Sequence, residues 1–374
     1  MVMVTELSPQ QAQQRMQAGV SVLDVRGEGE RALGMAEGVT VAELGALLET
    51  PQRYLPALDE EVGLICASGM RTRAAVHALR AQGYTHLWSV VGGTERWRQE
   101  GLPMTAAQES VEFLQRYSRH LLLPEIGLQG QRKLRDAKVA LIGAGGLGSP
   151  IALYLAAAGV GTLTLIDDDV VDRSNLQRQV VHGEADVGRA KVASAKARLL
   201  ALNPELHVLC HQTRLRANNV ATLLGGHDVV VDGTDNFSTR YLVNEACVRM
   251  NLPLVYGAVE RFRGQVSVFW PGQSGGCYRC VFPEPPPAEL APNCAEAGVL
   301  GVLPGLVGML QATEVLKLLL QIGQPLLGTL LCVDALSMHF DRIPLGRDMA
   351  CATCAPQADR QPYADLTAVC AGIS

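Results

Sequence analysis

The sequence predicts an α/β protein of two domains, and three observations carry this prediction. The 374 residues exceed the length of one ordinary domain, and 48% of them are apolar, which is enough for large cores. Short apolar runs alternate with helical patterns along most of the chain, as in a doubly wound sheet. Two glycine-containing loops follow apolar runs, at residues 66–71 and 143–148, where α/β folds place binding sites.

Composition and charge exclude several classes of function. The chain has 32 Lys and Arg against 37 Asp and Glu, a net charge of −5, so no basic field attracts nucleic acid. The N-terminus lacks the basic and apolar regions of a secretory signal. The apolar stretch 298–310 runs into Gln311, Glu314 and Lys317, which makes it too short to span a membrane. We expect a cytoplasmic protein without membrane or nucleic-acid partners.

The first domain is predicted to contain strands at 20–25, 62–66 and 86–91, with a helix at 71–82. A polar, alanine-rich segment at 105–110 follows, and it predicts a boundary that gives domains 1–106 and 107–374.

The second domain opens with a polar helix around residues 116–119 and then alternates strands with helices. The predicted strands are 138–142, 163–167, 208–210, 228–231, 254–256, 265–270 and 329–334. The predicted helices are 149–158, 190–202, 239–250 and a long one through Lys317, with a proline-rich loop at 282–293.

The loop Cys66-Ala-Ser-Gly-Met-Arg71 lies between a predicted buried strand and a helix. Backbone amides and a helix N-terminus can converge on the Cys66 sulfur there, which favours a thiolate or a persulfide anion. A buried structural cysteine is the alternative, but Gly69 and Arg71 at these offsets favour a reactive one.

These residues resemble those of a single-domain rhodanese. Asp24-Val-Arg26, Gly34-Met-Ala-Glu-Gly38, the Cys66 loop and Val91-Gly-Gly-Thr-Glu-Arg-Trp97 occur in family order. The resemblance implies that Cys66 carries a persulfide, held by Arg71 and the loop amides. Met35 and Ala67 stand where the family often has histidine and arginine. They argue against thiosulfate as donor and favour a cysteine desulfurase or another persulfide donor.

A second constellation begins with Gly143-x-Gly-x-x-Gly148 between a strand and a helix, and Asp167 ends the next strand. By itself this pattern predicts a dinucleotide site, so an NAD-dependent oxidoreductase is one alternative. It leaves Arg178 and Lys191 unexplained, and their positive charges suit a triphosphate.

Residues 116–354 resemble the ubiquitin-activating-like adenylyltransferases, specifically the activators of the molybdopterin-synthase and thiamine sulfur carriers. The resemblance implies an ATP site with Gly146 on the nucleotide and Asp167 on the ribose. Asp235 aligns with a magnesium-linked aspartate, and Arg119 with an arginine that reaches into the partner subunit's site, which implies a homodimer. The residues implied at the phosphates, or in the same segments, are Ser174, Asn175, Leu176, Gln177, Arg178, Lys191 and Asn236.

The remaining motif consists of Cys277-Tyr-Arg-Cys280 and Cys351-Ala-Thr-Cys354, two Cys-x-x-Cys pairs far apart in the chain. This spacing predicts a closed tetrahedral zinc site with a structural role, with disulfides as the competing explanation. Cys294 resembles a family position that in some members bonds covalently to the sulfur carrier, and it is a candidate catalytic thiol.

Together these features predict an enzyme that uses ATP and Mg²⁺ to adenylate the C-terminal glycine of a ubiquitin-like sulfur carrier ending in Gly-Gly. The molybdopterin synthase small subunit is the favoured carrier. Persulfide sulfur from Cys66 would then give a thiocarboxylate. Two further alternatives are a rhodanese half that only docks partners, and a thioester to Cys294.

Overall fold

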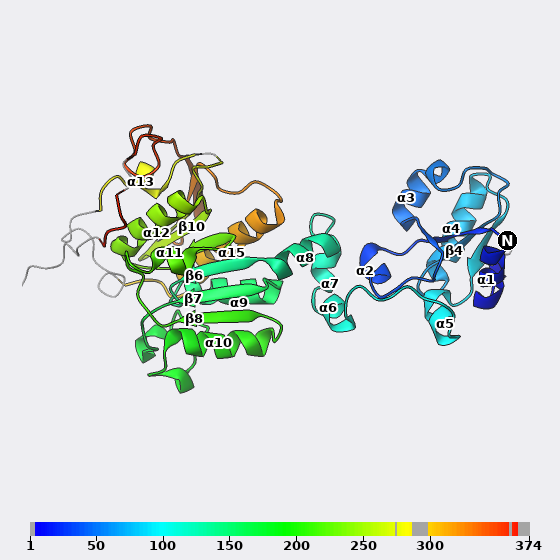
Figure 1. Cartoon of the computed structure of the whole chain (residues 1–374), viewed down its shortest axis with the longest axis horizontal. Coiled ribbons are helices and arrows are strands. Elements are labelled where there is room, and N and C mark those ends of the chain that lie inside the picture. The colour runs from blue at the N-terminus through cyan, green and yellow to red at the C-terminus, as the bar shows by residue number, and fades with distance from the viewer. Residues whose placement is uncertain (1–3, 274, 286–297, 359–360, 366–374) are drawn as a thin grey trace, which may run out of the picture. The chain divides into compact units, whose positions relative to one another are not determined.

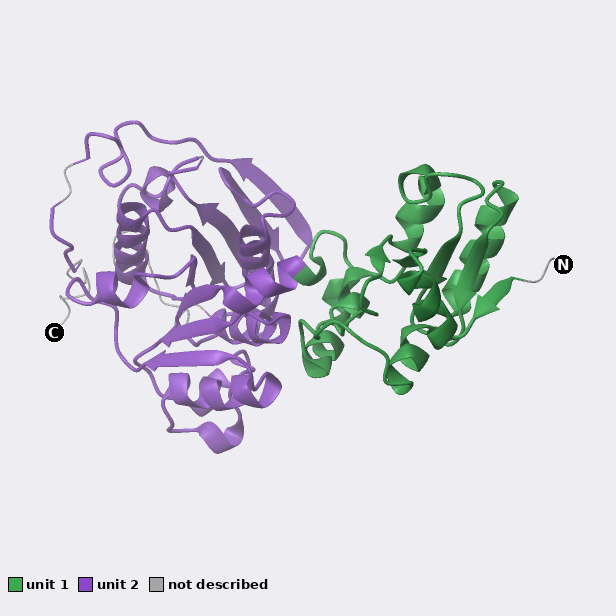
Figure 2. Cartoon of the chain, turned by 45° about the vertical axis from the view of Figure 1, so that its right-hand side comes forward, with its two compact units in different colours: residues 1–128 green, residues 129–374 purple. Residues whose placement is uncertain are grey.

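Two separate sheets organise the chain, one in residues 1–128 and the other in residues 129–374 (Figure 2). The computed structural model describes residues 4–273, 275–285, 298–358 and 361–365. Its α/β character confirms the predicted fold class, and each unit is described by itself below.

The sheet of the first unit has five parallel strands in the order β1-β5-β4-β2-β3. These strands are β1 (Thr5–Leu7), β2 (Ser21–Asp24), β3 (Thr40–Val41), β4 (Val62–Ile65) and β5 (Leu87–Val90). The predicted strands at 20–25, 62–66 and 86–91 are therefore correct to within one residue at each end, because each is a continuous apolar run of the kind that parallel sheets bury.

Helices cover both faces of this sheet. One face packs against α3 (Leu44–Glu49) and α4 (Met70–Ala81), and the other against α1 (Pro9–Gln17) and α5 (Gly93–Gln99). Ser8 caps α1 through a capping box with Gln11, which satisfies two amides at the start of the helix. The shorter helices of the unit are α2 (Glu28–Arg31), the 3₁₀ turn η1 (Pro51–Arg53), α6 (Val111–Arg116) and α7 (Ser118–Leu121).

Residues beyond 106, which the sequence assigns to the second domain, contribute to a small apolar cluster in the first unit. Phe113, Leu114 and Tyr117 pack there with Ala32 and Leu128. Ser110 caps α6 by accepting a hydrogen bond from the Phe113 amide.

The sheet of the second unit has eight strands in the order β13-β12-β11-β10-β9-β6-β7-β8. The parallel strands are β6 (Lys138–Ile142), β7 (Thr162–Ile166), β8 (His207–His211), β9 (Val229–Asp232) and β10 (Leu254–Glu260). The antiparallel strands are β11 (Arg263–Phe269), β12 (Thr329–Asp334) and β13 (His339–Pro344). The parallel part of the sheet thus continues into an antiparallel edge of three strands. The sequence predicted β11 and β12 but not β13.

Helices cover both faces of the sheet around its parallel strands (Figure 1). One face packs against α9 (Gly148–Ala158), α10 (Lys191–Leu202) and α15 (Leu303–Leu320), and the other against α11 (Val220–Leu224) and α12 (Phe237–Met250). The shorter elements are α8 (Gly127–Asp136), η2 (Arg173–Asn175), η3 (Glu184–Asp186) and α13 (Tyr278–Val281).

The strand order reverses between β6 and β9. The chain runs from β6 to β7 and β8 on one side, and then returns to β9 and β10 on the other. At such a switch point the connections after neighbouring strands diverge and open a crevice at their carboxyl ends. The loops that follow β6 and β9 carry the Gly143–Gly148 motif and Asp235.

Helix α15 is the one helix among the described residues that is long and apolar enough to cross a membrane by length and composition. Half of its apolar window is buried inside the fold. Leu303, Val307 and Val315 belong to the main core of the unit, so α15 is a core helix.

Candidate functional site

Cys66 follows β4 directly, and its side chain is fully buried. The Gly69 amide donates a hydrogen bond to its sulfur over 3.1 Å, and the Thr72 hydroxyl lies 3.7 Å from the sulfur. Gly69 has a φ of +88°, which turns its amide towards the cysteine in a conformation that suits glycine. Of the backbone donors that the sequence predicts at Cys66, the described contacts show one, the Gly69 amide.

The start of α5 holds the outer side of this loop. The amides of Thr94 and Glu95 donate to the carbonyls of Cys66 and Ala67, over 2.8 and 3.0 Å. Gly93 makes this approach possible, because a Cβ there would lie 2.1 Å from the Cys66 carbonyl oxygen. The loop carbonyls are therefore bonded on the side away from the sulfur, at a position that the Gly-Gly pair of the sequence marks.

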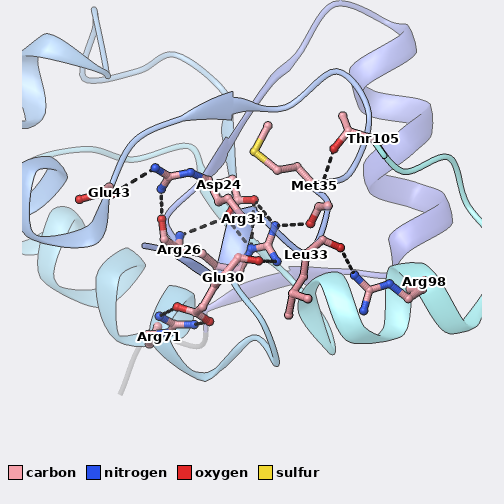
Figure 3. Close-up of polar contacts among 11 residues, drawn as sticks. Asp24, Arg26, Glu30, Arg31, Leu33, Met35, Glu43, Arg71, Arg98 and Thr105 are labelled. Atoms are coloured by element: carbon pink, nitrogen blue, oxygen red, sulfur yellow. Dashed lines mark hydrogen bonds and ion pairs between the residues drawn. The ribbon is translucent and has the colours of Figure 1, made fainter. Parts of the chain in front are cut away.

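Arg71 is held by Glu30 through two hydrogen bonds of 2.7 and 2.6 Å (Figure 3). Glu30 raises the pKa of Arg71, and the nearby Cys66 sulfur raises it further, so the guanidinium interacts with both groups. The same pair lowers the pKa of Glu30, although partial burial opposes this. Sequence reasoning missed Glu30.

The second site is a pocket at the switch point of the larger sheet. Its lining includes six of the residues implied at the ATP site, namely Gly146, Asp167, Arg178, Lys191, Asp235 and Asn236. Further lining residues come from the glycine loop and from the segments after β7, β8 and β9. The structure thus brings together residues that are up to 90 positions apart in the chain.

Asp167 ties the glycine loop to the end of β7. Its carboxylate accepts hydrogen bonds from the Ala144 amide at 2.7 Å and the Asp169 amide at 2.8 Å. Burial raises the pKa of Asp167, while Lys191 and the two amides favour its charged form.

The cations of the pocket are arranged differently from one another. Lys191 is buried at the start of α10 and forms an ion pair of 2.8 Å with Asp169. Arg178 is half-buried and donates to the Ser174 carbonyl over 3.1 Å. The pocket therefore joins a carboxylate-paired ammonium to a guanidinium that folds back on its own turn.

A buried ion pair between Asp232 and Arg240 supports the turn that carries Asp235. Asp232 accepts hydrogen bonds from the Thr234 amide at 2.9 Å and hydroxyl at 2.6 Å, and Arg240 donates to the Thr234 carbonyl at 2.8 Å. Arg240 also lies over the Tyr256 ring, at 5.5 Å from its centroid. Together these contacts fix the turn that presents Asp235 to the pocket.

The other residues of the sequence-predicted site lie elsewhere. Ser174 and Asn175 belong to η2, which Asp172 caps, and Leu176 and Gln177 follow it; none of the four is among the described lining residues. Arg119 is exposed on α7 of the first unit. Cys294 lies outside the described residues.

Among the pocket-lining residues to which the sequence assigned no role, three make contacts or leave an atom unpartnered in a way that bears on the site. Asp169 pairs with Lys191, Arg240 braces the Asp235 turn, and Gln179 is buried with its Oε1 unpartnered within the described structure. Gln179 directly follows Arg178, so its position beside a predicted phosphate residue was the available signal.

The four cysteines of the two Cys-x-x-Cys pairs come together. Their sulfurs all lie within 4.8 Å of one another, with 3.7 Å between Cys277 and Cys351 and 3.4 Å between Cys280 and Cys354. A disulfide would need about 2.0 Å, whereas a tetrahedron of Zn–S bonds of about 2.3 Å places sulfurs about 3.8 Å apart. All eight described cysteines are free, so the competing disulfide explanation fails for this group.

The chemistry of the cluster also suits a metal. Burial and the neighbouring sulfurs raise the pKa of Cys277 and bring that of Cys354 to about 11, so the thiolates need a cation to be stable together. The Asn244 side chain donates to the Cys277 sulfur, and the Thr353 amide donates to Cys351. Four soft ligands with such supporting donors fit zinc.

The fold and its sites define a class: a nucleotide-binding α/β unit with a four-cysteine cluster, joined to a unit that presents a sulfur on a tight loop. The chain belongs to the ThiF family, which it matches over residues 117–353, and residues 8–100 match the rhodanese-like domain.

Relatives and solved structures agree with this assignment. The probable adenylyltransferase/sulfurtransferase MoeZ of Mycobacterium tuberculosis is 48% identical, over 70% of this chain and 68% of that protein. The sulfur carrier protein adenylyltransferase of Thermus thermophilus is 48% identical, over 69% of this chain and 97% of that protein. The structure of E. coli MccB with ATP is 26% identical, with a TM-score of 0.53, over 60% of this chain and 68% of that one.

Proposed function

We propose that the protein uses ATP to adenylate the C-terminal glycine of a ubiquitin-like sulfur carrier and then replaces AMP with sulfur delivered on Cys66. The chain is an adenylyltransferase and sulfurtransferase, in line with relatives of that description at about 48% identity. The observation that carries the proposal is the presence, in one chain, of a charged nucleotide pocket and a cysteine sulfur that receives a backbone hydrogen bond.

Adenylation requires positioning and charge neutralisation more than a protein nucleophile. The carrier carboxylate attacks the α-phosphate of ATP, and pyrophosphate leaves. Asp167 would bind the ribose, while Arg178 and Lys191 would neutralise the charge that develops on the phosphates. Ser174, Asn175, Leu176, Gln177 and Asn236 would complete the site, and Arg119 would enter the site of the partner in a homodimer.

Magnesium fits this pocket because it prefers carboxylate oxygens and phosphates. Asp235 lines the pocket, and the carboxylates of Asp167, Asp168 and Asp169 lie within 4.8 Å of one another. Asp235 and these carboxylates would hold the ion, which would offset the negative charge of the phosphates. Zinc in the four-cysteine cluster would tie the C-terminal segment to α13, with a structural role only.

Sulfur transfer then follows at the activated carbonyl. The terminal sulfur of the Cys66 persulfide attacks the acyl adenylate, and AMP leaves with the electron pair of the broken C–O bond. The product is an acyl disulfide between carrier and Cys66. A second thiol attacks the Cys66 sulfur, which releases the thiocarboxylate and leaves a disulfide on the enzyme. Cys294 is the proposed second thiol.

The partners follow from this chemistry. A cysteine desulfurase or another persulfide donor would load Cys66, and the small subunit of molybdopterin synthase is the favoured carrier. Free thiols at all eight described cysteines suit a reducing cytoplasm.

The test is intact-mass spectrometry of a purified carrier after incubation with the enzyme, ATP, Mg²⁺ and a persulfide donor. We expect a thiocarboxylate on the carrier with the wild-type enzyme and only adenylate or unmodified carrier with Cys66→Ala. Thiocarboxylate formation by Cys66→Ala would show that the first unit serves another role, such as docking. Absence of any adenylate with every candidate carrier would contradict the activation step.

A further inference from the structure

The carboxylate of Glu30 pairs with the guanidinium of Arg71, the last residue of the Cys66–Arg71 loop. Arg71 binds both oxygens of Glu30, and its pKa is also raised by its interaction with Cys66. A negative charge on Glu30 therefore lies next to the group that is expected to hold the persulfide.

The segment that carries Glu30 is held in place from several sides (Figure 3). Arg26 forms a buried ion pair with Asp24 and donates to the carbonyls of Glu30 and Gly34. Arg31 donates to the Arg26 carbonyl and pairs with Glu43. These contacts fix α2, so Glu30 is presented to Arg71 by a braced backbone rather than by a loose surface turn.

The same contacts pair three arginines of this region with carboxylates. Arg26, Arg31 and Arg71 each have a carboxylate partner, so each contributes a neutral ion pair. At the sulfur itself, the Gly69 amide is the backbone donor that the described contacts show. Amide dipoles stabilise one negative charge at short range, whereas a second negative charge would be repelled by the Glu30 carboxylate.

We propose that Glu30 is a specificity-determining residue that excludes dianionic sulfur donors from Cys66 and admits singly charged ones. The inference rests on the proposed sulfur transfer and adds to it the charge class of the donor. A persulfide carried on a protein cysteine has one charge at its reacting end, whereas thiosulfate has two.

The discriminating step is the loading of Cys66. The thiolate attacks the outer sulfur of the donor, an S–S bond forms at Cys66, and the donor S–S bond breaks with its electron pair on the leaving group. Thiosulfate releases sulfite in this step, and methanethiosulfonate releases methanesulfinate. These two donors share the same reacting S–S bond and differ by one negative charge, which makes them matched probes.

The experiment measures kcat/KM for both donors with cyanide as sulfur acceptor, on the full-length enzyme at low and high salt. We expect wild type to prefer methanethiosulfonate, and to lose much of this preference at high salt, because screening weakens the repulsion by partly exposed Glu30. In Glu30→Gln the thiosulfate rate should rise about fivefold relative to the methanethiosulfonate rate at low salt.

Glu6→Gln is the matched control, because Glu6 pairs with Arg73 of the same helix as Arg71. Its loss removes one carboxylate from the same unit and should leave the donor ratio unchanged. Thermal unfolding of each variant checks that the unit is intact.

If Glu30→Gln does not fold, the donor preference of the wild-type enzyme and its salt dependence still test the proposal. Equal use of both donors by wild type, without salt dependence, would overturn the role of Glu30 and leave sulfur transfer standing. An unchanged donor ratio in folded Glu30→Gln would do the same. Failure of Cys66 to take sulfur from either donor, as judged by mass, would overturn both the inference and the sulfur transfer on which it rests.

Discussion

The two units of this chain use cysteine sulfur in opposite ways. In the first unit one sulfur, that of Cys66, accepts a hydrogen bond from the Gly69 amide, and Cys66 is the one cysteine in residues 1–128. In the second unit four sulfurs lie within 4.8 Å of one another and would share one cation. The first arrangement stabilises a single negative charge and leaves the sulfur available for bond formation, whereas the second consumes the reactivity of all four.

The largest expected effect is the loss of a cluster cysteine. Cys277→Ser should abolish zinc binding and destabilise the second unit by about 5 kcal/mol, because metal binding free energy is also folding free energy. Cys332→Ser, a half-buried sulfur on β12 outside the cluster, should change stability by less than about 1 kcal/mol. Zinc content and thermal unfolding measure the difference.

Cys277→Ser should leave the folding and the persulfide uptake of the first unit unchanged, and their loss would contradict the comparison of the two units. The sheet and cores of the first unit are built from its own residues, so we expect Cys66 to remain protected from proteolysis and to accept persulfide. Parallel loss of both activities would mean that the units are not independent.

A smaller effect is expected where the sulfur loop meets α5. Gly93→Ala places a Cβ 2.1 Å from the Cys66 carbonyl oxygen at a φ of +55°, and should cost about 3 kcal/mol. Gly101→Ala has a φ of +69° but nothing within 4 Å, so it should cost about 1 kcal/mol from backbone strain alone. Denaturant unfolding of the two variants separates collision from strain, and equal losses would refute the close approach.

Substitution of Thr72 tests whether a side chain, in addition to the backbone, supports the reactivity of the Cys66 sulfur. Thr72 is buried, lies 3.7 Å from the sulfur and donates to the Gly69 carbonyl at 3.0 Å. Thr72→Val keeps a similar shape and removes these contacts, together with the 2.6 Å contact to the Ser89 hydroxyl, and should slow alkylation of Cys66 by iodoacetamide about threefold. An unchanged rate would show that the amides act alone.

Acid should affect the second unit more than the first. Burial lowers the pKa of His182 below its ordinary value near 6.5, although Asp186 and Asp167 oppose this and Lys191 adds to it. Below pH 6.5 the unfolded chain takes up a proton that native His182 does not accept, so stability falls from there towards the native pKa.

His182→Gln should flatten this decline, which urea unfolding at several pH values between 5 and 7 would detect. His182 bonds Ser194 and the Ala144 carbonyl in the folded state, so the variant is less stable at pH 7 but less sensitive to acid. A variant that retains the full decline would assign it to another group, such as half-buried His227, whose pKa burial also lowers.

Much of the fold was legible in the sequence, because parallel strands are continuous apolar runs. The bounds of β6 and β12 were predicted to the residue. Strand β13 was missed, because all six of its residues are exposed and only pairing with β12 makes them a strand. Local pattern carries no information about an edge strand whose side chains never enter the core.

The candidate site was predictable where spacing alone encodes it, as in the two Cys-x-x-Cys pairs and the glycine loop. The pairing of Glu30 with Arg71 was not, because the residues are 41 positions apart and Glu30 belongs to no motif. The role of Arg240 was not predicted for the same reason. In the sequence it cannot be distinguished from an exposed cation of a helix, because its carboxylate partner, Asp232, lies on β9.

The hydrogen bonds from α5 to the carbonyls of Cys66 and Ala67 have one more consequence. Peptide groups have no proton to gain or lose in the physiological range, so the polarity they give the sulfur loop is constant between acid and alkaline conditions. Their dipoles also fade within a few ångströms, unlike the field of a free charge. The polarity of these peptide groups therefore acts only over the few ångströms around Cys66, at any pH at which the unit is folded.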